Sequence, residues 1–194
     1  MGVILTVCHW WIVGLWVAFL IYWAIAAIHM RRGLNLSELR GGMGIRLVLF
    51  LMIAVAIVLA RRSVDLQALQ WTVFHSVPMA MIGALLATLG AIVAFAARAA
   101  IGRNWGPPAT RRTDTELVTS GPYALVRHPI YSGILLMLIG TAVGLIPAWW
   151  LVATAAGIYF FVSARAEERF MAERFPDAYP AYRARTRMLI PFLL

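Results

Sequence analysis

The chain has 194 residues and a formal net charge of +9, with 62% hydrophobic and only 13% charged residues. Soluble domains contain about 45–50% apolar and about 25% charged residues, so this composition excludes disorder, a coiled coil and a typical soluble enzyme. We therefore predict a membrane protein, in agreement with a mean hydropathy of +0.82.

Three apolar runs in the first half of the chain are predicted transmembrane helices, because about 20 apolar residues cross a bilayer. They cover Val3 to Ile28, Leu47 to Ala60 and Val77 to Ala97. The second run is short, so the arginines at its ends must extend toward the head groups. The first run lacks a basic leading segment and a small-residue cleavage site, and we expect no signal peptide.

The last apolar run, from Ile130 to Ala164, contains no charged residue. It is too long for one helix and long enough for two short ones. Gly144 and Pro147 indicate a turn between the two, next to Trp149 and Trp150, which are typical of the membrane interface. We predict a tight helical hairpin, and five transmembrane helices in all.

The expected fold is all-α, a polytopic membrane protein with a single membrane domain over residues 1–194. Residues 1–97 hold the three N-terminal spans, and residues 98–194 hold a polar loop, the hairpin and a short cytoplasmic C-terminal helix. The charged tail is expected to form this amphipathic helix against the membrane face, broken at Pro176 and Pro180.

Arginine placement orients the chain, because cytoplasmic loops are enriched in basic residues. With the N-terminus outside, 15 of the 17 basic residues fall in cytoplasmic segments, and only Arg61 and Arg62 fall outside. Arginines that lie at lipid head groups in this way do not indicate nucleic-acid binding. The lysine-free, arginine- and alanine-rich usage is typical of a GC-rich bacterial genome, so we expect a bacterial inner membrane with the C-terminus in the cytoplasm.

The densest polar stretch precedes the predicted hairpin and reads Leu117-Val-Thr-Ser-Gly-Pro-Tyr-Ala-Leu-Val-Arg-His-Pro-Ile-Tyr-Ser-Gly133. Pro129 fits the first turn of a helix, so Arg127, His128 and free backbone N–H groups are expected at the cytoplasmic mouth of the hairpin. Tyr131 lies about one turn further and faces the same way. Alone, each residue reads as a cap or an interfacial anchor; together they indicate a binding site.

Two adjacent carboxylates, Glu167 and Glu168, follow the last predicted helix on the same side of the membrane. Such carboxylates must meet water, arginine or a cationic ligand, although a solvated helix end is the simpler interpretation. The turn at the far end brings the ends of the hairpin together, which places this pair beside Arg127 and His128. Adjacent helical residues point about 100° apart, so the two carboxylates cannot serve one ligand group equally.

The remaining polar residues carry weak signals. The single cysteine, Cys8, excludes an internal disulfide and a zinc cluster, and we expect no bound metal. No glycine-rich nucleotide motif, P-loop or hydrolase motif is present. A nucleotide-like cofactor would therefore bind without a Rossmann fold.

The run from Gly121 to Gly133, followed by an apolar hairpin and Glu167-Glu168, resembles the signature of the isoprenylcysteine carboxyl methyltransferase family. The closing residues 175–182, Phe-Pro-Asp-Ala-Tyr-Pro-Ala-Tyr, are similar to that family's C-terminal segment. The resemblance implies S-adenosyl-L-methionine as cofactor. It also implies methyl transfer to a lipophilic small molecule or lipid at the cytoplasmic membrane face, without fixing the acceptor or whether oxygen, nitrogen or sulfur is methylated.

The same resemblance implies roles for individual residues. The family's acceptor-orienting arginine falls near Ser163, where this sequence departs from the pattern, and Arg165 is the candidate replacement. The family's cofactor contacts fall on Thr115, Glu116, Leu117, Val118, Tyr123, His128, Pro129, Ile130 and Tyr131, and its cofactor-binding acidic residue falls on Glu167.

Two other functions stay open at this point. One is an NADPH-dependent membrane reductase of the sterol-reductase type, with Arg111 and Arg112 as candidates for binding the 2′-phosphate. The other is a non-catalytic membrane protein in which the motif serves assembly. Binding of S-adenosylhomocysteine, of NADPH or of neither would distinguish the three.

Overall fold

The computed structural model describes residues 2–31, 76–105, 116–145 and 149–191. Within these ranges the chain is all-α, as the sequence predicts, and two 3-10 turns flank the loop before the hairpin. The α-helices are α1 (Gly2–Arg31), α4 (Val77–Ile101), α5 (Pro129–Gly144), α6 (Trp149–Arg174) and α7 (Ala178–Arg185), and the 3-10 turns are η2 (Gly102–Asn104) and η3 (Gly121–Ala124).

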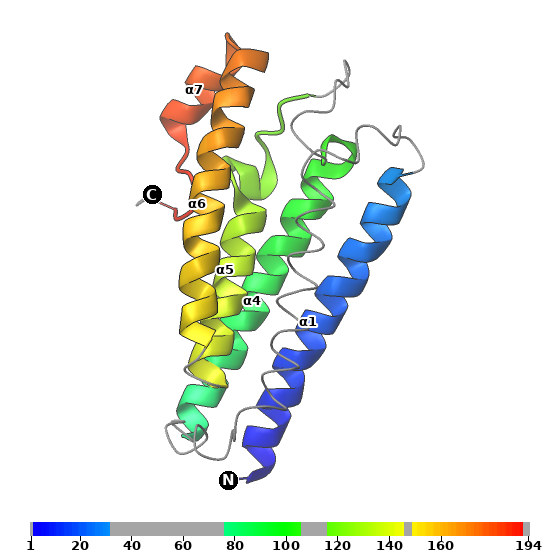
Figure 1. Ribbon diagram of the computed structural model, residues 1–194, viewed down its shortest axis with the longest axis vertical. Coiled ribbons are helices and arrows are strands. Elements are labelled where there is room, and N and C mark those ends of the chain that lie inside the picture. Colours follow the sequence, from blue (N-terminus) through cyan, green and yellow to red (C-terminus); the bar gives the residue numbers. More distant parts are fainter. Residues whose placement is uncertain (1, 32–75, 106–115, 146–148, 192–194) are drawn as a thin grey trace.

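Three of these helices are long and apolar enough to cross a membrane, namely α1, α4 and α6, and α5 is a shorter apolar helix of 16 residues. They lie side by side in the order α1, α4, α5, α6 (Figure 1). The first, third and hairpin spans predicted from the sequence are thereby confirmed as helices. The second predicted span, Leu47 to Ala60, and the turn residue Pro147 lie outside the described residues.

Polar contacts within the apolar layer join α1 to its neighbours. The indole nitrogen of Trp11 donates to the Thr88 hydroxyl of α4 at 2.8 Å, and that of Trp16 donates to the Thr141 hydroxyl of α5 at 3.0 Å. Thr141 is buried and in turn donates to a backbone carbonyl of its own helix. Since an unpaired polar group costs several kcal/mol in lipid, these pairs fix how α1 sits on α4 and α5.

Glycines allow α4 and α5 to pack with their backbones almost in contact. A Cβ atom added to Gly90 would lie 2.6 Å from the Gly133 carbonyl oxygen, and one added to Gly133 would lie 2.7 Å from the Ala94 nitrogen. Gly83 and Gly140 meet in the same way toward the other end. Small residues that let helix backbones approach this closely are the usual means of helix association in membranes.

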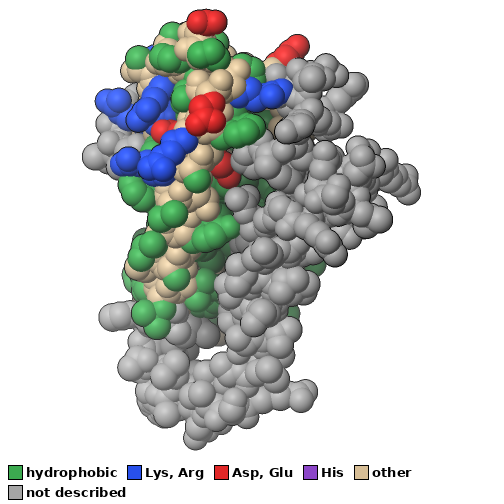
Figure 2. Space-filling model, turned by 45° about the horizontal axis from the view of Figure 1, so that its top comes forward, with side chains coloured by type: hydrophobic (Ala, Val, Ile, Leu, Met, Phe, Trp, Pro, Cys, Tyr) green, Lys and Arg blue, Asp and Glu red, His purple; other side chains and the backbone are tan. Residues whose placement is uncertain are grey.

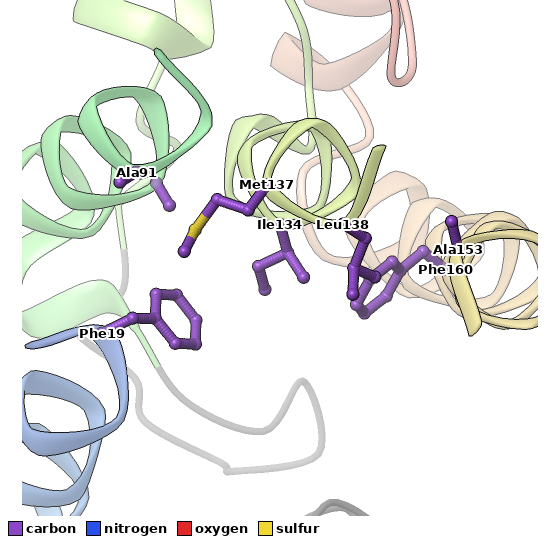
Figure 3. Packing of buried hydrophobic residues seen from close by; sticks show 8 residues of the cluster. Phe19, Ala91, Ile134, Met137, Leu138, Ala153 and Phe160 are labelled. Carbon is purple, nitrogen blue, oxygen red and sulfur yellow. The ribbon is translucent and has the colours of Figure 1, made fainter. Parts of the chain in front are cut away.

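The apolar core lies where all four long helices meet. Figure 3 shows Met137 of α5 extending toward Phe19 of α1 beneath Ala91 of α4, while Leu138 lies against Phe160 of α6. Met137 is fully buried. The core therefore ties α5 to both of its neighbours and fixes the position of its first turn, where the polar motif begins.

The end of α6 differs from the sequence-based expectation. We expected the tail from Ser163 to form a separate short helix broken at Pro176 and Pro180, but α6 continues without interruption to Arg174. Pro176 does separate α6 from α7. Pro180 does not break α7, because it lies in the first helical turn, where its missing N–H would have no intrahelical partner.

Candidate functional site

Charged side chains gather at one end of the molecule. Figure 2 shows arginines and carboxylates at this end and exposed hydrophobic side chains below them along the bundle. The gathering lies where α5 begins, where α6 ends and where α7 packs beside them (Figure 1). We call this end of the bundle the polar mouth. As expected, the turn at the far end of the hairpin makes the two motif-bearing ends neighbours.

The segment that leads into α5 is held by the chain that follows α7. Val126 pairs with Arg187 in an isolated parallel β-bridge, and the Arg127 backbone N–H donates to the Arg187 carbonyl at 2.8 Å. The His128 N–H donates to the Met188 carbonyl at 3.1 Å. The backbone N–H groups of Arg127 and His128 are therefore occupied by the C-terminal segment and do not contribute to the free N–H groups that we expect at the start of α5.

The arginine of the motif and the second carboxylate form a buried ion pair. Arg127 Nε lies 2.6 Å from Glu168 Oε1, and the two side chains are 8% and 4% exposed. Arg127 also donates through Nη1 to the Thr186 carbonyl at 2.5 Å. One guanidinium therefore joins α5, α6 and the C-terminal segment, and Glu168 meets an arginine, which is one of the three partners expected for the two carboxylates.

The first carboxylate faces the other two motif side chains. The Tyr131 hydroxyl donates to Glu167 Oε1 at 2.5 Å, and His128 Nδ1 lies 3.5 Å from Glu167 Oε2. The Tyr131 ring is stacked on His128 on one side and on Phe160 of α6 on the other. His128, Tyr131 and Glu167, which are 36 to 39 residues apart across the two helices, thus form one cluster.

His128 lies between both carboxylates. Its Nε2 atom is buried without a hydrogen-bond partner, 3.7 Å from Glu168 Oε1. Burial by itself lowers the pKa of the imidazole, but the Glu167 and Glu168 carboxylates outweigh it, and the pKa is raised above its ordinary value of 6.5. The two carboxylates therefore stabilise the protonated form of His128 more than water stabilises that of a free histidine.

Tyr123 forms the side of the mouth that faces α4. It lies in η3, a turn that begins at Gly121 with a positive φ of 60°, and it is buried. Its carbonyl accepts a hydrogen bond of 2.8 Å from the Tyr182 hydroxyl of α7. Burial raises the pKa of the Tyr123 phenol well above its usual range, and the charges of Arg98 and Glu167 act on it in opposite directions. The phenol therefore remains a neutral hydrogen-bonding group.

The other predicted cofactor residues lie on both sides of this cluster. The Glu116 backbone N–H donates to Asn104 Oδ1 at 3.4 Å, which ties the start of the loop to η2. Leu117 and Val118 are half-buried in the loop. Pro129 is fully buried, and Ile130 packs against the apolar core. Thr115 lies outside the described residues, as do Arg111 and Arg112 of the reductase alternative.

Arg165, the predicted acceptor-orienting residue, is exposed on a different flank of α6 from Glu167. Its guanidinium lies 4.9 Å from the centre of the Phe161 ring, and Phe161 packs against the buried Met188 and Leu189 of the C-terminal segment. A separation of two helical residues turns the side chains by about 200°, which explains the divergence. The structure does not bring Arg165 into the His128, Tyr131 and Glu167 cluster.

Within the described ranges, no group of three or more histidine, cysteine, aspartate or glutamate side chains is arranged to hold a metal ion. Two features of the mouth were not predicted from the sequence. One is that Arg127 binds backbone carbonyls of the C-terminal segment. The other is Arg98, at the end of α4, whose Nε is buried without a partner.

These features define an integral membrane protein whose bundle ends in a polar mouth with a carboxylate, an imidazole and stacked aromatic rings. The family model described as phospholipid methyltransferase matches residues 78–178, which is just over half of the chain and includes α4, α5 and α6. The chain belongs to this family.

The names of similar proteins state different functions. A methanethiol S-methyltransferase of Bradyrhizobium diazoefficiens is 36% identical over 92 residues, 47% of this chain and 30% of that protein. A protein-S-isoprenylcysteine O-methyltransferase of Arabidopsis thaliana is 34% identical over 85 residues, 43% of each chain. The cobalt-zinc-cadmium resistance protein CzcN of Cupriavidus metallidurans is 35% identical over 112 residues, 56% of this chain and 50% of that protein. The chain thus spans half or less of the length of these relatives.

Proposed function

We propose that this protein transfers a methyl group from S-adenosyl-L-methionine to a lipophilic acceptor at the cytoplasmic face of a membrane. The main structural support for this proposal is the cluster of Glu167, Tyr131 and His128 at the polar mouth. Family membership supports the reaction class, because the family model over residues 78–178 includes this cluster and two of the similar proteins are named as oxygen and sulfur methyltransferases.

The residues of the cluster fit the charged groups of this cofactor. The Glu167 side chain is 20% exposed at the mouth and is proposed to bind the ammonium group of the methionine part through its carboxylate. His128, with its buried and unpartnered Nε2, presents an N–H donor to the methionine carboxylate. Tyr131, Tyr123 and the loop residues Thr115, Glu116, Leu117 and Val118 are proposed to enclose the rest of the molecule, together with Pro129 and Ile130.

When bound, the cofactor supplies an electrophilic methyl group on a sulfonium. The protein then has to align the acceptor in line with that methyl group and exclude water, and it needs no strong acid or base for the transfer itself. Aromatic faces such as that of Tyr131 favour a nearby sulfonium by about 0.5–2 kcal/mol. The stacking of Tyr131 between His128 and Phe160 holds this ring in a fixed orientation.

The acceptor side is proposed from the sequence and from the bundle's apolar surface. We assign acceptor orientation to Arg165, which has no carboxylate within ion-pair distance among the described residues. The exposed hydrophobic faces of α1, α4 and α6 suit lateral entry of a lipophilic molecule from the bilayer. The arginine distribution supports a cytoplasmic mouth with the N-terminus outside.

Ligand binding tests this proposal without knowledge of the acceptor. The full chain, purified in a neutral detergent, is titrated calorimetrically with S-adenosylhomocysteine and separately with NADPH. Saturable binding of S-adenosylhomocysteine alone is the expected result. Binding of NADPH alone would identify a reductase instead, and binding of neither would make the motif an assembly surface.

A further inference from the structure

The end of α4 holds an arginine that the proposed cofactor site does not use. Arg98 lies in the last turn of α4, at the polar mouth, and donates through Nη1 to the Gly102 carbonyl at 3.0 Å. Its guanidinium lies over the Trp105 ring, 4.5 Å from the ring centre. These two contacts fix the guanidinium in place, so its remaining donors point in a defined direction.

The charge of Arg98 is not compensated in the described part of the chain. No carboxylate of these residues lies within ion-pair distance of it, in contrast to Arg127. Its Nε atom is buried and has no hydrogen-bond partner. A buried donor on a cation is costly to leave unpaired, which makes this position suited to an anionic group that the described residues do not provide.

The surroundings of Arg98 are apolar on the side that leads into the membrane. One turn before it, Phe95 meets the aromatic side chains of α1, with ring centres 5.1 Å from Tyr22 and 5.9 Å from Trp23. Ile21 of α1 and Ile92 of α4 are exposed along the same stretch. A cation above an apolar, aromatic surface matches a molecule that has an anionic head and an apolar tail.

Arg98 is also close to the proposed cofactor site. Gly121, which begins η3, approaches Ala100 of α4, since a Cβ on the glycine would lie 3.7 Å from the Ala100 Cβ. Tyr123 of the same turn feels the charges of both Arg98 and Glu167. Arg98 and the cluster at Glu167 are therefore both neighbours of the η3 turn.

We propose that Arg98 binds the anionic head group of the methyl acceptor, so that the acceptor is an amphiphile carrying a phosphate or a carboxylate. That this amphiphile is the methyl acceptor rests on the proposed function. That an anionic amphiphile binds at Arg98 does not depend on the proposed function. α5 lies between α4 and α6 (Figure 1), so Arg165 would act on another part of the acceptor.

The test uses the full chain in a neutral detergent and counts bound amphiphiles by native mass spectrometry. The probes are dodecyl phosphate and laurate, with dodecyltrimethylammonium as a cationic control of equal chain length. The variants are Arg98→Gln and Arg98→Lys, and Arg169→Gln is the matched control because Arg169 is an exposed arginine of α6. S-adenosylhomocysteine affinity and thermal unfolding are measured for every variant.

We expect one anionic probe to bind the wild type and Arg98→Gln to lower its affinity about ten- to a hundredfold, with little change in Arg169→Gln. Arg98→Lys keeps the charge without the planar fork and should show a smaller loss, which also covers a failure of Arg98→Gln to fold. Preference for dodecyl phosphate would identify a phosphate head group, and preference for laurate a carboxylate.

Equal binding of the cationic probe, or unchanged binding of the anionic probes by Arg98→Gln, would make Arg98 a simple interfacial anchor and overturn the proposal. A loss of S-adenosylhomocysteine affinity in Arg98→Gln would assign the residue to the cofactor instead. If the wild type binds an anionic probe but no S-adenosylhomocysteine, the methyltransferase proposal fails while the Arg98 site stands.

Discussion

The rings of His128 and Tyr131 are stacked with an interplanar angle of 6° and a centroid distance of 5.5 Å, and both residues contact the carboxylate of Glu167. This arrangement orients the carboxylate with a neutral donor on one oxygen and an ionisable donor on the other. A cationic ligand at Glu167 therefore competes with His128 for the same charge. Several consequences of this competition can be measured.

Substitutions of the two adjacent glutamates should have different effects on cofactor binding and on stability. Glu167→Gln keeps the shape and removes the charge, and we expect it to weaken S-adenosylhomocysteine binding by about 1.5–3 kcal/mol, or roughly ten- to a hundredfold. Glu168→Gln should leave that affinity nearly unchanged, because Glu168 is occupied by Arg127. Calorimetric titration of both variants and the wild type measures the difference.

Thermal unfolding of the same variants provides the reciprocal measurement. Glu168→Gln leaves the buried Arg127 without its ion-pair partner, which costs up to about 3–5 kcal/mol. Glu167 is less buried, so its replacement should destabilise the protein less. Equal and small losses of affinity in both variants would identify a solvated helix end and contradict the assignment of Glu167 to the cofactor.

His128 should make stability depend on pH in a definite direction. Its pKa is raised above 6.5 in the folded protein, so its contribution is fully present below that value and is lost as the pH rises through the higher folded pKa. The groups that face it are Glu167 and Glu168 of α6 and the stacked Tyr131, with Arg127 adjacent in sequence.

The measurement is the unfolding temperature of the wild type and of His128→Asn between about pH 6 and pH 9. We expect the wild type to lose stability over this range and the variant to show a flatter profile. If the unfolding temperature of the wild type depends on pH as weakly as that of the variant, His128 does not act as a counter-ion.

The glycine contact between α4 and α5 predicts a sharp difference between two similar substitutions. Gly133→Ala would place a Cβ 2.7 Å from backbone atoms of Gly90 and Ala94, and such overpacking costs about 1–3 kcal/mol. Gly14→Ala in α1 meets no atom within 4 Å and should be neutral or slightly stabilising, since alanine favours helix by about 1 kcal/mol. Unfolding temperatures in detergent compare the two, and equal values would show that α4 and α5 can separate at little cost.

Much of the fold follows from features that the sequence displays directly. The length of the apolar run after Pro129 predicts two helices, and a short turn then forces their ends together. The 100° step of the helix implies that Glu167 and Glu168 have different partners, and the structure shows Glu168 with Arg127 and Glu167 with Tyr131 and His128. The seven-residue spacing of glycines in α4 and in α5 is a further sequence feature that indicates close helix packing.

Other parts of the mouth could not be predicted because backbone groups form them. Arg127 donates to the backbone carbonyls of Thr186 and Arg183, which are 59 and 56 residues away. Every residue has a backbone carbonyl, so the sequence does not indicate which of them accept a hydrogen bond. For the same reason the sequence did not indicate that the N–H groups of Arg127 and His128 are occupied. α6 extends past its apolar part because arginine and glutamate favour helix and nothing before Pro176 ends it.

The predicted topology can be tested independently of any ligand. The bias of 15 basic residues against two predicts that the C-terminus lies in the cytoplasm. α1 and α4 run in the same direction (Figure 1), as expected if one further span separates them. A phosphatase reporter, active only outside the cytoplasm, should be inactive when fused after Leu194 and active when inserted between Arg61 and Arg62. The reverse pattern would invert the membrane orientation and place the polar mouth outside.

Arg165 should affect methyl transfer and cofactor binding differently if it orients the acceptor. It lies over Phe161, beside the buried Met188 and Leu189, and does not approach Glu167. We predict that Arg165→Ala lowers methyl transfer into extracted lipid, with labelled S-adenosylmethionine as donor, at least about tenfold, while S-adenosylhomocysteine affinity stays within about twofold of the wild type. A residue that orients the acceptor only must show this split, because the cofactor binds without it.

The matched control for Arg165 is Arg169→Ala, one turn further on the same helix and also exposed. Both variants remove one arginine from the polar mouth, so a general effect of surface charge on acceptor or membrane would appear in both. A loss of cofactor affinity in Arg165→Ala would mean that the residue supports the cofactor site through the C-terminal segment. Equal transfer rates in Arg165→Ala and Arg169→Ala would leave Arg98 as the sole arginine proposed to contact the acceptor.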